Sequence, residues 1–245
     1  MDSLKLRVTP KTPEPVDELP TGLVWVERGA QRAALFTPDE IEAGRRYPLL
    51  AVLHGAGRQD ELLMKAYRDE AERRQALFLV PRSHGMTWDL IEHAVAKSGG
   101  GARPEGRPDL DFLEYAYDLI FRRYPVDAER LGLLGYSDGA SYALSVGLSN
   151  PELFRAVMAW AAGFVAIENE AAAQDTRRPA VLIEYGTHDE LFPFEQVAVP
   201  MREQLEAFGC AVTFRVDQGG RHRPSGQFQD EALDWFFSEP WQPRS

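Results

Sequence analysis

The sequence has a single cysteine, fewer basic than acidic residues and no long apolar run, and each of these shortages excludes a class of protein. Cys210 is the only cysteine among 245 residues, so no disulfide can form within the chain. None is needed, because a chain of this length buries about 70 % of its unfolded surface. The first residues, Met1 to Arg7, lack an apolar stretch of signal-peptide length. We therefore expect neither a leader nor a membrane anchor, and a cytoplasmic location.

Basic residues are outnumbered by acidic ones. The chain has 27 Lys and Arg residues against 38 Asp and Glu residues, which gives a formal net charge of −11. An acidic surface repels phosphate backbones and anionic lipids, so we expect neither a nucleic acid nor a membrane as a partner. Four arginines lie near the loops described below, namely Arg58, Arg82, Arg221 and Arg223. They either recruit an anionic substrate or are solvated charges without a binding role.

The pattern along the chain predicts one domain of the α/β class. Four prolines within residues 1–20 predict an extended N-terminal arm outside the core. Over 21–245, short apolar runs alternate with helical patterns, as expected for a mostly parallel sheet covered by helices on both faces. Strands are predicted over 23–26, 33–36, 48–53, 76–80, 131–134, 154–161, 180–185 and 211–216, and helices over 60–74, 113–124, 139–148, 196–208 and 227–237. The segment 97–108 is too rich in Gly and Pro to form either.

The pentapeptide Gly135-Tyr136-Ser137-Asp138-Gly139 carries the strongest chemical signal. It matches G-x-S-x-G, a pattern that chance supplies about 0.07 times in a chain of this composition. It lies between an apolar strand and a small-residue helix, where a nucleophile elbow places its serine. The alternative is a Gly-Ser turn without catalytic meaning. The setting favours Ser137 as the nucleophile.

A serine hydroxyl needs a base, and the base needs an acid that holds its tautomer. The elbow predicts the chain order Ser, acid, His, which leaves His188 and His222 as candidate bases. His222 lies in a glycine-flanked loop after the last strand, and Asp189 follows the preceding strand. We predict His222 as the base and Asp189 as the acid. Glu168 or Glu170 is the fallback acid, and the alternative for Asp189 is a turn carboxylate that binds its own backbone.

Other strand ends suggest the rest of a catalytic site. His54-Gly55-Ala56-Gly57 follows a buried strand and can present backbone amides to an oxyanion. The predicted donors are the amides of Ala56 and Asp138, with Gly57 as a substitute, and the His54 ring is expected to shape the loop. Candidate pocket walls, for which core packing is an equally good interpretation, are Trp88, Tyr136, Phe192, Met86 and Phe164.

From about Leu23 to Phe237 the chain resembles the α/β-hydrolase superfamily, above all the carboxylesterase/phospholipase and polyhydroxybutyrate-depolymerase/feruloyl-esterase groups. The motifs that carry the resemblance are Leu53-His54-Gly55-Ala56-Gly57, Val126-Asp127-Ala128-Glu129-Arg130-Leu131, Gly135-Tyr136-Ser137-Asp138-Gly139-Ala140, Gly186-Thr187-His188-Asp189 and Gly220-Arg221-His222. The resemblance implies hydrolysis of small or medium carboxylic esters through an acyl-serine intermediate. Dienelactone hydrolases share this outline but place a cysteine where this chain has Ser137.

Three further expectations complete the sequence-based interpretation. Metal-ligand motifs, a P-loop and a complete dinucleotide fingerprint are missing from the sequence, so no metal or cofactor is expected. The segment 162–179 is too short for a large helical lid, which predicts an open cleft. The alternatives to an esterase are a serine peptidase or amidase with the same triad, and a non-catalytic binding protein of the same fold.

Overall fold

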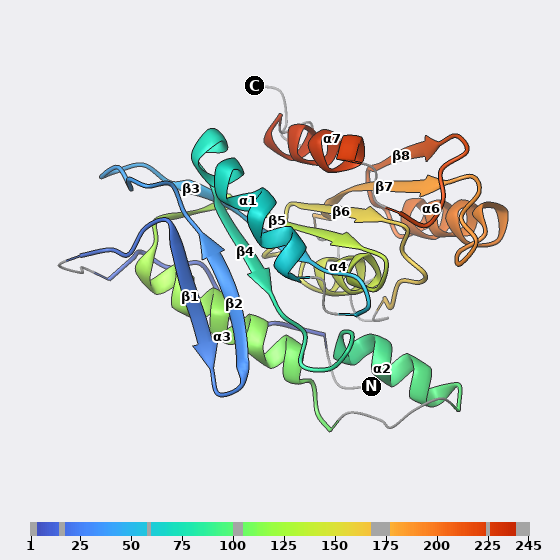
Figure 1. The fold of residues 1–245 in the computed structure, drawn as a ribbon, viewed down its shortest axis with the longest axis horizontal. Coiled ribbons are helices and arrows are strands. Elements are labelled where there is room, and N and C mark those ends of the chain that lie inside the picture. The colour runs from blue at the N-terminus through green and yellow to red at the C-terminus, as the bar shows by residue number, and fades with distance from the viewer. Residues whose placement is uncertain are drawn as a thin grey trace.

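The computed structural model describes residues 4–14, 18–57, 60–99, 105–167, 177–223 and 226–238, with the backbone alone for 60–66 and 226. Within these ranges one eight-stranded sheet has the order β1-β2-β4-β3-β5-β6-β7-β8 (Figure 1). Its strands are β1 (Leu23–Arg28), β2 (Gln31–Phe36), β3 (Tyr47–Leu53), β4 (Leu77–Pro81), β5 (Val126–Tyr136), β6 (Ala156–Trp160), β7 (Ala180–Gly186) and β8 (Val212–Asp217). Only the pairs β1–β2 and β2–β4 are antiparallel, so the prediction of a mostly parallel sheet is confirmed.

Helices lie on both sides of this sheet. They are α1 (Asp60–Arg74), α2 (Asp89–Lys97), α3 (Pro108–Arg123), α4 (Asp138–Ser149), the π-helical turn η1 (Phe194–Ala198), α6 (Val199–Ala207) and α7 (Gly226–Phe237). In Figure 1, α1 crosses in front of the sheet, whereas α3 and α4 lie behind it. An ion pair between Arg74 and Asp234 joins α1 to α7. The predicted two-sided covering of the sheet is therefore confirmed.

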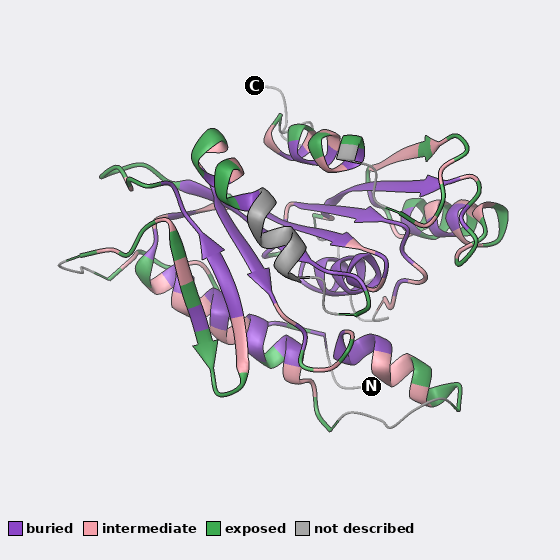
Figure 2. Ribbon diagram, in the orientation of Figure 1, coloured by how far each residue is buried: buried purple, intermediate pink, exposed green. Residues whose placement is uncertain are grey.

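The core lies between the central strands and these helices. β3, β4, β6 and β7 are buried along their whole length, which Figure 2 shows as continuous purple. Strands that are buried over their whole length are typical of a sheet that is covered on both faces. On α3 the predicted apolar face is buried, including Leu113, Tyr117 and Phe121. The helical period in the sequence thus identified the face that contacts the sheet.

Several elements differ from the sequence-based expectation, and α3 begins at Pro108 rather than at 113. The sequence did not predict α2, a nine-residue helix whose first residue, Asp89, is buried. Its start depends on contacts with α3 that are distant in sequence. β5 begins at Val126 rather than at 131, because Val126 pairs with Tyr47 before an irregularity in the register. Residues 100–104, in the segment predicted to lack an element, lie outside the described residues.

The N-terminal arm has no helix or strand in its described residues, but it is not outside the core. Leu4, Leu6 and Val8 are buried in the hydrophobic core. Asn150 holds the arm, since its Oδ1 accepts the Leu6 amide at 2.8 Å and its Nδ2 donates to the Leu4 carbonyl at 2.9 Å. The expectation that these residues lie outside the core is wrong at these three positions. Apolar side chains at every second residue of an extended chain fall on one face, which here covers the domain. The division into an arm and one domain stays a prediction.

In the described part of the chain, no helix has the length and apolarity needed to cross a membrane.

Candidate active site

Ser137 lies at a sharp turn between β5 and α4. Its φ of 53° and ψ of −117° place a residue with a side chain in a region that L-amino acids rarely adopt. The surrounding backbone compensates for this strain. Ser137 N–H donates to the carbonyl of Trp160 on β6 at 2.8 Å, and the Ser137 carbonyl accepts the Ser141 amide at 3.0 Å. Such strain persists only where neighbouring structure determines it, and it is common at functional sites.

The two glycines of the pentapeptide permit this turn. A Cβ on Gly135 would lie 2.2 Å from the carbonyl oxygen of Gly139. A Cβ on Gly139 would lie 2.3 Å from the carbonyl oxygen of Leu53 and 2.4 Å from that of His54. Any larger residue would separate α4 from β3 and β5. The glycines therefore set how closely the start of α4 approaches the end of β3.

The side chains of Ser137, His222 and Asp189 form one chain of hydrogen bonds. His222 Nε2 lies 2.9 Å from Ser137 Oγ, and His222 Nδ1 lies 2.8 Å from Asp189 Oδ2. In the tautomer that accepts the Ser137 proton, Nδ1–H donates to Asp189. The Asp189 side chain is fully buried and that of His222 is 8 % exposed. The three side chains thus make the hydrogen bonds that a Ser-His-Asp triad requires, and their catalytic roles stay a prediction.

Two loops bring Asp189 and His222 together. The loop after β7 and the loop after β8 are joined by backbone hydrogen bonds from Thr187 N–H to the Asp217 carbonyl (3.0 Å) and from His188 N–H to the Gly220 carbonyl (2.8 Å). A Cβ on Gly186 would lie 2.3 Å from the Gly220 carbonyl oxygen, so a glycine is required there. The His188 side chain is exposed. His188 therefore contributes a backbone hydrogen bond between the two loops and not its side chain.

Asp189 makes the contacts that both interpretations require, one set for each carboxylate oxygen. Oδ1 accepts the amides of Leu191 (2.9 Å) and Phe192 (2.8 Å), as a turn carboxylate would. Oδ2 remains for His222. The turn thus orients the carboxylate toward the imidazole. The fallback acids Glu168 and Glu170 lie outside the described residues.

Aromatic rings surround His222. The ring centroids of Phe192, Tyr136 and Trp160 lie 5.1, 5.5 and 5.8 Å from that of His222. The Tyr136 hydroxyl also donates to the His222 carbonyl at 3.2 Å. These contacts restrict the imidazole to the orientation in which it bridges the serine and the aspartate. Trp160 was not a predicted site residue, because its sequence context is an ordinary buried strand.

Glu184 is a buried acid next to this aromatic cluster. It pairs with Trp160 in the β6–β7 register and is 6 % exposed. Burial raises its pKa to about 7, an effect that the nearby Glu231 and Asp217 carboxylates reinforce, whereas the neighbouring Trp160 indole and the Arg215 charge oppose it. The sequence offered no signal for this, since the shift arises from strand pairing.

The His54 ring organises the loop after β3. It is 1 % exposed, and its Nε2 accepts the Ser83 amide at 3.1 Å, so the proton resides on Nδ1 and is donated to the Gly55 carbonyl at 2.6 Å. The ring also stacks on Trp88, with a centroid distance of 4.7 Å. The position agrees with the loop-shaping role expected for His54.

Two of the three predicted oxyanion donors are available. Asp138 is the first residue of α4, where the amide has no partner within the helix. No described residue accepts the amide of Ala56, which is exposed beside Gly55. Gly57 as a substitute is wrong, because its N–H already donates to the carbonyl of Met86 at 2.9 Å.

The five predicted pocket residues fall into different environments. Met86 is 66 % exposed, and Tyr136 and Phe192 are half-buried beside His222. Trp88 is 1 % exposed and stacks between His54 and Tyr142, so its burial corrects the expectation of a pocket wall. Trp88 packs against the His54 ring inside the core. Phe164 is half-buried as well.

The arginines give no further constraint on the substrate. Arg221 is exposed and lies 3.9 Å from Glu190, and Arg223 is exposed. Arg82 is half-buried, and Arg58 lies outside the described residues. Recruitment of an anionic substrate by this group stays a prediction.

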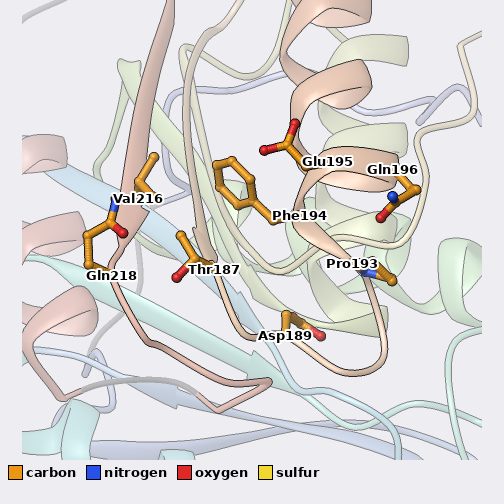
Figure 3. A pocket seen from close by; sticks show the side chains of 8 residues that line it. All are labelled: Thr187, Asp189, Pro193, Phe194, Glu195, Gln196, Val216 and Gln218. Atoms are coloured by element: carbon orange, nitrogen blue, oxygen red, sulfur yellow. The ribbon is translucent and has the colours of Figure 1, made fainter.

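A hollow of about 550 Å³ lies on the outer side of the acid loop, between η1 and the end of β8. In Figure 3 the Phe194 ring and the Gln218 side chain stand on different walls of it, with Asp189 at one end. Neither Ser137 nor His222 is among its described lining residues. The hollow is therefore separate from the hydroxyl of Ser137. No group of three His, Cys, Asp or Glu side chains in the described ranges is arranged to hold a metal ion.

Comparison with known proteins supports the same architecture. No family model matches the chain. A curated protein of Nocardia uniformis subsp. tsuyamanensis, "Putative esterase NocK", is 27 % identical over 203 residues, which cover 77 % of this chain and 54 % of that protein. The chain thus spans about half the length of this curated relative.

Solved structures match over most of their length. The acetyl xylan esterase of Aspergillus awamori has a TM-score of 0.69 at 15 % identity, with 88 % of this chain and 98 % of that chain covered. The S-formylglutathione hydrolase of Staphylococcus aureus has a TM-score of 0.67 at 15 % identity, with 90 % and 99 % covered. Esterase PE8 has a TM-score of 0.61 at 20 % identity, with 89 % and 99 % covered. With its sheet order and its elbow, the chain has the α/β-hydrolase fold.

Proposed function

We propose that this protein is a serine hydrolase that cleaves carboxylic esters through an acyl-serine intermediate. The observation that carries the proposal is the unbroken hydrogen-bond chain from Ser137 Oγ through His222 to Asp189, at 2.9 and 2.8 Å. A strained serine, a buried carboxylate and an imidazole between them are the groups that acyl transfer requires. A protein that only binds ligands would have no use for this arrangement.

In the proposed reaction, Ser137 Oγ attacks the ester carbonyl while His222 Nε2 accepts its proton. The carbonyl oxygen becomes an oxyanion, which accepts hydrogen bonds from the Ala56 and Asp138 amides. His222 then gives the proton to the leaving alcohol, and the acyl-enzyme forms. Water attacks this ester with His222 again as the base, and His222 returns the proton to Ser137 Oγ as the acyl–oxygen bond breaks and the carboxylic acid leaves. Asp189 Oδ2 accepts the hydrogen bond from His222 Nδ1–H and stabilises the imidazolium.

Two exposed apolar side chains support an uncharged acyl or alcohol group as the substrate. Met86 is 66 % and Leu191 is 63 % exposed. Met86 lies on the segment that contacts Gly57, and Leu191 is two residues from Asp189. We call this pair the apolar rim. Each methylene that the rim removes from water contributes about 0.8 kcal/mol, which raises kcat/KM about fourfold.

The names of the similar proteins support ester chemistry without selecting a substrate. Three of these proteins are named as esterases, and one is named as a hydrolase of S-formylglutathione, a thioester. A small or medium ester with an apolar acyl group is the substrate class that we propose. The expected cytoplasmic location stays a prediction.

The test is hydrolysis of nitrophenyl esters with acyl chains from acetyl to decanoyl, together with matched nitroanilides. Ser137→Ala is expected to lose about 10⁴-fold or more in kcat. Ser98→Ala, at an exposed serine after α2, is the control and should keep full activity. Turnover of the anilides at a rate equal to the esters would favour an amidase. No turnover by the wild type, or equal turnover by Ser137→Ala, would refute the proposal.

A further inference from the structure

The segment between β4 and α2, residues 83–88, contacts the loop that carries the Ala56 amide at three points. We call this segment the bracing loop. Ser83 N–H donates to the His54 ring at 3.1 Å, and the Met86 carbonyl accepts the Gly57 amide at 2.9 Å. The Trp88 indole N–H donates to the His54 carbonyl at 2.8 Å. These bonds hold His54 and Gly57, which lie before and after Ala56 in the chain.

The same loop also reaches the other proposed oxyanion donor. Thr87 Oγ1 donates to the carboxylate of Asp138 at 2.6 Å. Asp138 supplies its backbone amide to the proposed oxyanion hole, so its side-chain contact restrains the residue that carries this donor. Trp88 adds a stacked contact with Tyr142 of α4, at a centroid distance of 5.0 Å. The bracing loop therefore links the two donors, which come from different strand ends.

A buried pair of carboxylates holds the bracing loop itself. Asp109 Oδ1 accepts the His84 amide at 2.5 Å, and its Oδ2 accepts the Asp89 amide at 2.7 Å. In return, Asp89 Oδ2 accepts the Asp109 amide at 2.8 Å. The two residues are 1 % and 3 % exposed. Each thus caps the first turn of the other's helix, a reciprocal contact between α2 and α3.

Both oxygens of Asp109 are needed as acceptors, because each faces a backbone N–H. An amide side chain at this position would turn one NH₂ group toward a donor and leave a buried N–H unsatisfied. The contacts of Asp109 are at His84 inside the bracing loop and at the residue that follows the loop. A change at Asp109 is therefore transmitted to Met86 and Thr87 through a few bonds of backbone.

We propose that Thr87 and Asp109 are positioning residues of the oxyanion hole, which hold the bracing loop so that the Ala56 and Asp138 amides point at one oxygen atom. The inference rests on the proposed ester hydrolysis. Neither side chain needs to touch the substrate. Because an oxyanion hole acts on the charge that develops in the transition state, these residues affect kcat more than KM. A misplacement of about 1 Å costs about 10²-fold in rate.

The experiment compares Thr87→Val, which removes the hydroxyl at constant shape, with Thr87→Ser, which keeps it. On a nitrophenyl ester, Thr87→Val is expected to lower kcat about tenfold to a hundredfold with KM within about twofold. Thr87→Ser is expected to restore most of the rate. Thr213→Val on β8 makes the same chemical change away from the site and should leave kcat unchanged. Asp109→Asn is expected to act like Thr87→Val.

A transition-state analogue separates positioning from general structural damage. Butylboronic acid forms a tetrahedral adduct with the serine whose oxygen occupies the oxyanion hole. Its Kd should rise in Thr87→Val by the same factor by which kcat/KM falls. If Asp109→Asn does not fold, as judged by thermal unfolding, Thr87→Val decides. A kcat within twofold of the wild type in Thr87→Val, or a loss that Thr87→Ser does not restore, would overturn the inference.

Hydrogen exchange provides a readout that does not depend on turnover. The amides of residues 54–57 should exchange faster in Thr87→Val and Asp109→Asn than in the wild type or Thr213→Val. An inactive wild type would refute the proposed function and leave this readout to decide whether the bracing loop holds these amides. Unchanged exchange in both variants would overturn the inference even if the ester hydrolysis is correct.

Discussion

Asp189→Asn tests how the carboxylate sets the tautomer of His222. Asp189 Oδ1 accepts two backbone amides, from Leu191 and Phe192, while Oδ2 faces His222 Nδ1. In the variant, the asparagine oxygen should stay on the side of the two amides. Its NH₂ group then points at Nδ1, which accepts only when the proton is on Nε2. That nitrogen faces the Ser137 hydroxyl at 2.9 Å and can no longer take its proton.

The fall in kcat depends on the free-energy cost of the amide orientation that would let His222 act as the base. Turning the amide over places NH₂ against two backbone N–H donors and leaves both unsatisfied, at about 1–3 kcal/mol each. The competent orientation is therefore disfavoured by about 2–6 kcal/mol, a population of about 1 in 30 to 1 in 10⁴. A wrong tautomer at an otherwise intact triad lowers kcat by about 10⁴. We expect a fall in kcat within this range and toward its upper end.

The assay is kcat on a short nitrophenyl ester at saturating substrate, together with thermal unfolding to establish that the variant is folded. Asp69→Asn, at an exposed residue of α1, makes the same change elsewhere and should not alter kcat. A folded Asp189→Asn protein that retains more than about a tenth of the wild-type kcat would show that Asp189 does not control the His222 tautomer.

Three other predictions address the fold around the site. Gly139→Ala would place a Cβ 2.3 Å from a carbonyl oxygen at the end of β3, so urea unfolding should show a loss of about 1–3 kcal/mol or more and ester turnover should fall with it; unchanged stability would contradict this close approach. Burial raises the pKa of Glu184 to about 7. This acid then retains its proton in the folded state after the unfolded chain has lost it, so the free energy of unfolding decreases as the pH rises from about 4 to 7, by about 3 kcal/mol at most. Glu184→Gln should flatten this decrease in urea titrations at several pH values, and an equal slope in the variant would argue against the shift. Asn150→Ala removes two side-chain hydrogen bonds to the N-terminal arm and one to the Val146 carbonyl of α4. It should cost about 1–3 kcal/mol for each group left unsatisfied, with faster proteolysis within residues 4–14; equal protease resistance would mean that the other contacts of the arm are enough to hold it.

The sequence by itself determined those features whose cause is local. The alternation of apolar runs predicted a parallel sheet, and a 3.6-residue period identified the buried face of α3. The G-x-S-x-G turn is also local, because its two glycines and its serine are neighbours in the chain. These signals require only the conformational preferences of short segments.

The tertiary structure decided which groups are available once the segments meet. Only the fold shows that the Gly57 amide is already bound to Met86 and that Trp88 lies beneath His54. Helix α2 begins at an acid whose partner, Asp109, is 20 residues away. The Asn150 side chain binds the backbone of the N-terminal arm where the arm packs on the core. Hydrogen-bond partners and burial depend on residues far apart in the chain, and no local pattern encodes which of two neighbouring amides will find an acceptor.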